Sequence, residues 1–141
     1  IPLVERSAFN FILIRYAEVL LTYAEAQNEA NGPDQSVYDA INQLRKRPDI
    51  NMPEVPKGLT KDQMREVIRR ERRIELTFEG LYYSDILRWK TAEKENNGMM
   101  HNYDGIEVVK RSFNPKRDYL WPIPYNQTVL NPNLEQNPNW D

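Results

Sequence analysis

Hydrophobic residues recur every three or four positions over the first two-thirds of this chain, and this spacing predicts amphipathic α-helices. We expect four helices, at about residues 15–30, 35–47, 61–79 and 82–92. The apolar stripe predicted for the first helix consists of Tyr16, Val19, Leu20, Tyr23, Ala26 and Ala30. Residues 93–141 show no helical period and are expected to form a loop and an irregular tail.

The predicted helix ends carry recognisable stop and start signals. Gly32-Pro33 ends the first helix, because glycine suits a helix C-terminus and proline cannot continue one. Thr60 and Gln63 have the spacing of a capping box at the start of the third helix. The first two helices with their turn span about the 34 residues of a tetratricopeptide (TPR) unit, an antiparallel helix pair. We therefore expect an all-α, TPR-like fold made of such pairs.

Three glutamates, Glu71, Glu75 and Glu79, form a ladder with a spacing of four residues on the third helix. Glu71 and Glu75 share a face with the apolar residues Met64, Val67, Ile68, Ile74 and Phe78. A carboxylate on a packing face needs a partner, because an unpaired buried charge is very costly. The partners expected from the sequence are the neighbouring arginines, Arg65, Arg69, Arg70, Arg72 and Arg73. One of these arginines should also meet Glu18 or Glu25 of the first helix.

The tail contains a hairpin signal and several aromatic residues. Asp104-Gly105 between two short apolar runs indicates a tight hairpin. Further on, Leu120, Trp121 and Ile123 are expected to be buried and to anchor the proline-rich tail on the helices. Trp140, beside the C-terminus, is the aromatic residue most expected to be exposed. It is therefore the one candidate ligand contact, a surface on which a sugar ring could stack.

Length and composition fit one soluble globular domain over residues 1–141, with 40% hydrophobic and 28% charged residues. A net charge of −2 argues against binding nucleic acid, which needs a basic patch. The chain has no cysteine and only one histidine, His101, so we expect no metal, no cofactor and no catalytic residues. Retaining glycosidases use two carboxylates across a cleft, but a ladder on a packed helix face offers no cleft.

Three separated segments also resemble one family. They are Arg15 to Glu29 (RYAEVLLTYAEAQNE), Arg70 to Trp89 (RERRIELTFEGLYYSDILRW) and Tyr119 to Trp140 (YLWPIPYNQTVLNPNLEQNPNW). Together they resemble the C-terminal region of SusD/RagB proteins, which are outer-membrane lipoproteins that capture nutrients. Proteins of that family are several times longer than 141 residues, so the resemblance implies that this chain is a C-terminal fragment.

The resemblance implies a scaffold role in a cell-surface protein that binds glycans, or peptides in some members. It implies delivery to a SusC-like TonB-dependent outer-membrane transporter and a lipid anchor in the missing N-terminal part. The oligosaccharide would be bound mainly by that missing upstream part. Two alternatives remain open at this point: a TPR-like adaptor that binds a peptide, and a hydrolase that uses the glutamate ladder.

Overall fold

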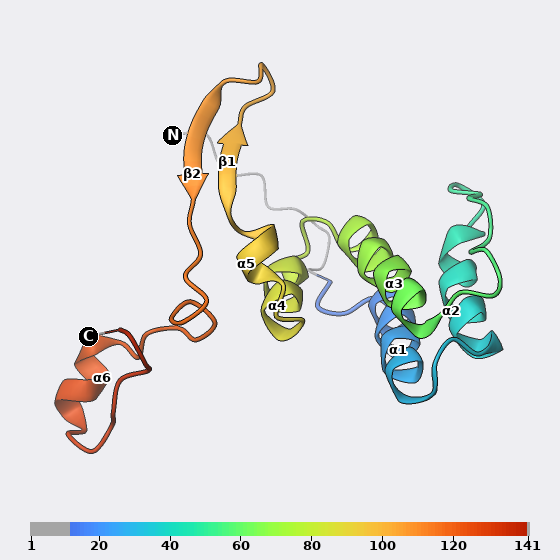
Figure 1. Ribbon diagram of the computed structural model, residues 1–141. Helices are drawn as coiled ribbons and strands as arrows, with labels where there is room; N and C mark the ends of the chain where they lie inside the picture. Colours follow the sequence, from blue (N-terminus) through green and yellow to red (C-terminus); the bar gives the residue numbers. More distant parts are fainter. Residues whose placement is uncertain (1–11, 141) are drawn as a thin grey trace, which may run out of the picture. The chain divides into compact units, whose positions relative to one another are not determined.

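The computed structural model of this chain describes residues 12–140 (Figure 1). In order along the chain, its elements are α1 (Tyr16–Asn31), α2 (Gln35–Arg45), α3 (Lys61–Glu75), α4 (Leu81–Arg88), α5 (Ala92–Glu95), β1 (Gly98–His101), β2 (Glu107–Arg111) and α6 (Tyr125–Leu130). The described residues divide into two compact units, one ending at Glu79 and one starting at Gly80. The mainly helical content agrees with the prediction, while the single domain over residues 1–141 stays a prediction.

The predicted start signal of α3 is present as hydrogen bonds, and α2 begins with a side-chain cap that was not predicted. The Asp34 side chain accepts hydrogen bonds from the backbone N–H groups of Ser36 and Val37. Thr60 and Gln63 form the complete capping box, each side chain accepting from the other residue's backbone N–H. These bonds satisfy donors that have no partner inside a helix, so the starts of both helices were readable from local sequence.

The buried face of α1 differs from the predicted stripe. Its buried residues are Ala17, Leu20, Leu21, Ala24 and Asn28. By contrast, Tyr16, Val19 and Tyr23 are exposed. Helix α1 contacts both α2 and α3, and alanines allow neighbouring helices to approach closely. The inward face therefore carries Leu20 and Leu21 together with Ala17 and Ala24, while Tyr16, Val19 and Tyr23 lie on the outward face.

Helix α3 ends at Glu75, four residues before the predicted end. The Thr77 hydroxyl donates to the carbonyl oxygens of Arg73 and Ile74, which competes with continuation of the helix. Phe78 then adopts a positive φ of 65°. Phe78 therefore lies outside the helix and is exposed; Ile74, inside the last turn of α3, is exposed as well, so neither belongs to the buried apolar face that they were predicted to share.

In the second unit, the predicted helix 82–92 is two shorter helices. Helix α4 ends at Arg88, and Lys90 takes a positive φ of 57° before α5 begins. A small core of Ile86, Ala92 and Phe113 forms here, with Tyr82 and Tyr119 packed against it. Phe113 and Tyr119 bring the beginning of the tail onto α4 and α5, and their rings meet edge to face.

The predicted hairpin is present. Strands β1 and β2 pair in antiparallel fashion, with a bulge between Met100 and His101. The loop is longer than a two-residue turn. The Asn102 side chain accepts hydrogen bonds from the N–H groups of Asp104 and Ile106, and Gly105 supplies a positive φ of 78°. All strand residues are exposed on both faces.

Polar bonds hold the tail where burial was predicted: Leu120 and Trp121 are exposed, and only Ile123 is half-buried. Trp121 is 70% exposed and Leu120 52%. The Gln136 side chain instead closes a pair of bonds with Ile123, accepting from its N–H at 2.7 Å and donating to its carbonyl at 2.9 Å. Asn137 donates to the Trp121 carbonyl in the same way. A proline-rich backbone forms few regular ladders, so amide side chains satisfy its polar groups.

We expect Gln136→Leu to loosen the tail, because both bonds to Ile123 are lost. A typical hydrogen bond contributes about 1 kcal/mol, so the loss of two bonds should accelerate amide exchange at Ile123 by about thirtyfold. Gln127→Leu is the matched control, since Gln127 lies in α6 and no hydrogen bond of its side chain is recorded within residues 12–140. Equal exchange at Ile123 in the two variants would show that the Gln136 bonds do not order the tail.

Candidate functional site

The glutamate ladder of α3 is a network of ion pairs with arginines from outside that helix. Glu75 pairs with Arg15 and with Arg47, each at 2.6 Å. Glu71 pairs with Arg45 at 2.9 Å. The predicted partners, the neighbouring arginines of α3, were wrong for these two glutamates. Arg72 and Arg65 of α3 instead contact glutamates of α1.

Arg15 also binds the end of α3. Its guanidinium pairs with Glu79 at 2.8 Å and donates to the backbone carbonyl of Glu75. The last carbonyls of a helix have no partner within it, so a cation there satisfies an open acceptor and fits the helix dipole. Arg15 thus joins the start of α1 to the C-terminal end of α3.

The other charged face of α3 meets α1 as predicted. Arg72, a buried arginine, forms an ion pair with Glu25 at 3.8 Å and donates a hydrogen bond to the Thr22 hydroxyl at 3.0 Å. Arg65 donates hydrogen bonds to both carboxylate oxygens of Glu29. Helices α1 and α3 therefore pack through charged as well as apolar contacts.

The environment of Glu75 in the ladder suits ion pairing between helices and does not suit acid–base catalysis. Burial by itself raises the pKa of Glu75, but hydrogen bonds from Arg15 and Arg47 outweigh it and hold that pKa below its ordinary value. A general acid needs the opposite shift, toward a pKa near the working pH. Glu75 is therefore an ionised structural partner at neutral pH.

The described residues contain neither a cluster of metal-binding side chains nor a helix that could span a membrane. Within residues 12–140, no group of three or more His, Cys, Asp and Glu side chains could hold a metal ion. His101, the single histidine, lies exposed on β1. The expected absence of metal, cofactor and catalysis stays a prediction. No helix in this part of the chain is long and apolar enough to cross a bilayer.

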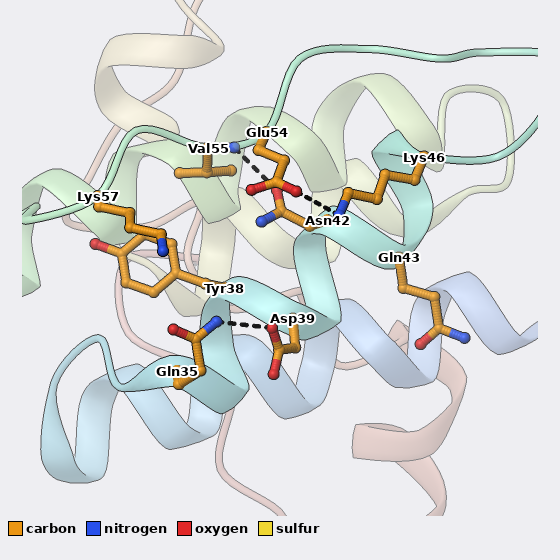
Figure 2. A pocket seen from close by; sticks show the side chains of 9 residues that line it. All are labelled: Gln35, Tyr38, Asp39, Asn42, Gln43, Lys46, Glu54, Val55 and Lys57. Carbon is orange, nitrogen blue, oxygen red and sulfur yellow. Dashed lines mark hydrogen bonds and ion pairs between the residues drawn. The ribbon is translucent and has the colours of Figure 1, made fainter.

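A polar groove of about 270 Å³ lies between α2 and the loop that follows it (Figure 2). Two buried α2 residues hold the loop in place: Asn42 accepts from the Val55 N–H at 2.9 Å, and the Tyr38 hydroxyl accepts from the Leu59 N–H at 3.1 Å. Along the rim, Lys46 pairs with Glu54. Asn42, Tyr38, Lys46 and Glu54 are thus engaged within the chain, and the polar side chains of Gln43 and Lys57 also line the groove.

None of these groove residues was identified from the sequence. The available signal was the presence of Tyr38 and Asn42, two polar residues, on the side of α2 that faces inward. Buried polar groups need partners, and here the partners are backbone N–H groups of a loop.

The aromatic residues of the tail are arranged differently from the prediction. Trp140 is half-buried: its Nε1–H donates to the Leu120 carbonyl at 2.9 Å, and the Arg117 guanidinium lies 4.4 Å from its ring centre. Trp121 is the exposed tryptophan, and its ring meets Tyr83 edge to face. Both tryptophans line a groove of about 160 Å³ together with Phe113. Trp140 is thus bonded within the second unit, and part of its ring is covered, which leaves less surface for a sugar ring to stack on. Its role as a ligand contact stays a prediction.

Comparison with known proteins gives a consistent result. A family model described as the SusD family matches residues 4–140. The chain is 36% identical over 136 residues to SusD-like protein P2 of Formosa agariphila, an alignment that covers 93% of this chain and 26% of that protein. It is 31% identical to SusD-like protein P38 of the same organism, over 91% of this chain and 24% of that protein.

Solved structures agree with these relatives. A SusD-like carbohydrate binding protein of Bacteroides fragilis matches with a TM-score of 0.78 and 38% identity, over 87% of this chain and 28% of that one. A SusD homolog of Bacteroides thetaiotaomicron matches with a TM-score of 0.72 and 32% identity, over 95% and 30%. These neighbours confirm the all-α, TPR-like fold class. The chain spans about a quarter of the length of the relatives it matches.

We expect Glu75→Ala to destabilise the chain strongly, because Arg15 and Arg47 would both lose their shared partner. Breaking a buried pair costs about 3–5 kcal/mol. Because the Glu75 side chain is 16% exposed and so not fully buried, the loss should lie at the lower end, at about 3 kcal/mol. Glu93→Ala is the matched control at an exposed position with no recorded side-chain partner in the described part of the chain. Chemical denaturation compares the two; equal free energies of unfolding would contradict the role given to Glu75.

The contribution of Glu75 should also depend on pH. Its pKa is lower in the folded chain than in the unfolded chain, so the stabilisation is present at neutral pH and is lost as the pH falls through the folded pKa. The difference in unfolding free energy between the wild type and Glu75→Gln should therefore be greatest at neutral pH and shrink as the pH falls through the lowered pKa of Glu75. A difference that stays constant over this range would show that ionisation of Glu75 does not contribute.

Proposed function

Because this chain belongs to the SusD family, we propose that it is the C-terminal scaffold part of a cell-surface protein that binds glycans. The observation that carries this proposal is the family match over residues 4–140, combined with coverage of only about a quarter of each relative. In this proposal, the longer protein is a lipid-anchored, non-enzymatic binding protein of the outer membrane. It hands its oligosaccharide to a SusC-like TonB-dependent transporter.

The described residues support a scaffold more than a ligand site. Glu71 and Glu75 of α3 are engaged by arginines of other elements, and Asn42 and Tyr38 of the α2 groove are engaged by the loop beside it. A sugar platform needs several exposed rings in one plane, and of the exposed rings in the second unit, which include Tyr103 and Tyr125, Trp121 and Tyr83 are the two that contact each other. Two rings at 72° to each other do not form one flat stacking surface. We therefore assign the main glycan contacts to the upstream part of the longer protein.

The function is tested by comparing the 141-residue chain with the longer protein from the same gene. In calorimetric titrations with oligosaccharides that its source takes up, the longer protein should bind saturably at micromolar concentration. The 141-residue chain should show no saturable heat. On an immobilised oligosaccharide, outer-membrane extracts should yield the longer protein together with a TonB-dependent transporter.

Two results would contradict this assignment. Failure of the longer protein to retain any glycan would remove the proposed function. Saturable binding by the 141-residue chain, abolished by Trp121→Ala or Trp140→Ala, would instead make the tail a binding site. Tyr103→Ala, which removes a fully exposed ring from the hairpin loop, serves as the aromatic control.

A further inference from the structure

The outward face of α1 carries an apolar groove of about 360 Å³ that is open among residues 12–140. Its lining consists of Ile14, Glu18, Val19, Thr22, Tyr23 and Ala26. Val19 is 50% exposed and Tyr23 47%. An exposed patch of this kind on a helix is typical of a surface that another structural element covers.

The spacing of the lining residues indicates what fits there. Within α1, Glu18, Thr22 and Ala26 follow one another at intervals of four, and Val19 and Tyr23 form a second row with the same interval; Ile14, just before the helix, also lines the groove. Rows at this interval are the ridges of a helix surface, and the groove between two such rows receives a ridge of a second helix. The wall is also preformed, because the Tyr23 hydroxyl donates to Ser36 on α2 at 2.8 Å.

One charge lies in this apolar groove. Glu18 is half-buried, and no hydrogen bond or ion pair of its side chain is recorded among the described residues. Its neighbour two turns along α1, Glu25, has Arg72 as a partner. A half-buried carboxylate is most stable beside a cation, so a complementary helix would place a lysine or arginine opposite Glu18.

We propose that this groove receives an apolar α-helix with one basic residue opposite Glu18, and that this helix belongs to the upstream part of the same polypeptide. The inference rests on the proposed function, which places the chain inside a longer protein. About three-quarters of the length of each matched relative lies outside the aligned region, which leaves ample chain to supply the helix. A helix pair of the TPR kind buries its faces by stacking on neighbouring pairs, and α1 presents such a face.

The absence of cysteine from the 141 residues allows a direct test by thiol labelling. Val19→Cys reports on the groove, and Lys57→Cys, in an exposed loop, is the control. In the longer protein, with any other cysteine replaced, each labelling rate is divided by the rate of the same variant in urea. The normalised rate at position 19 should be at least about tenfold lower than at position 57, because labelling must wait for the packed helices to separate.

In the 141-residue chain, the two normalised rates should be similar. Equal rates in the longer protein would overturn the proposal. Protection of position 19 in the 141-residue chain would also overturn the proposal. Protection that does not depend on protein concentration would mean that this chain itself covers the groove. Protection that increases with concentration would mean that a second copy covers it. Ala26→Cys provides a second groove position if Val19→Cys fails to fold.

The charge opposite Glu18 has its own readout. In the longer protein, Glu18→Lys should lower the melting temperature more than Glu18→Gln, because a second cation would repel the basic residue. In the 141-residue chain, the gap between the two variants should be smaller, because only the unfavourable position of a lysine in the first turn of α1 remains. Neither this measurement nor the labelling involves a glycan, so a failure here is distinguishable from a failure of glycan binding. Equal melting of the two variants in the longer protein would remove the basic residue from the proposal.

Discussion

The carboxylate of Glu75 is the interaction on which the arrangement of the first unit depends. Glu75 is the last residue of α3, Arg15 directly precedes α1, and Arg47 lies just beyond the end of α2. One side chain therefore ties together an end of each of the three helices, through two ion pairs at 2.6 Å. Hydrophobic contacts hold helices together over a range of rotations and shifts, whereas a carboxylate between two arginine forks accepts only one register.

The two units are ordered by different physical means. In the first, long helices bury Leu21, Ile41 and Ile68 almost completely, and ion pairs fix their register. In the second, the apolar core is small, and the tail keeps its path through amide side chains that bond to the backbone. This difference follows from composition, because a segment rich in proline and asparagine has few N–H groups in regular ladders and many side chains that can replace them.

The surfaces left open in the two units also differ in chemistry. Helix α1 presents a groove with the row spacing of a helix-packing surface, while the second unit presents Trp121, Tyr83 and a hairpin exposed on both faces. A scaffold packs against the rest of its own protein, so its open surfaces need not be ligand sites. The proposed scaffold role agrees with family membership. It would also account for the exposure of apolar side chains such as Val19 and Tyr23 in a chain that spans about a quarter of the length of its relatives.

The sequence by itself determined the features that depend on a few consecutive residues, namely the caps at Asp34 and Thr60, the stop at Gly32 and the hairpin loop before Ile106. It also determined the family, because the segment from Arg70 to Trp89 and the tail motif are specific strings. Only the tertiary structure decided the partners of Glu71 and Glu75, the buried face of α1 and the exposure of Trp121. Each of these depends on which helices meet and at what rotation. A helical period identifies an apolar stripe, but α1 is apolar on more than one side, so only its contacts with α2 and α3 select the face that is buried.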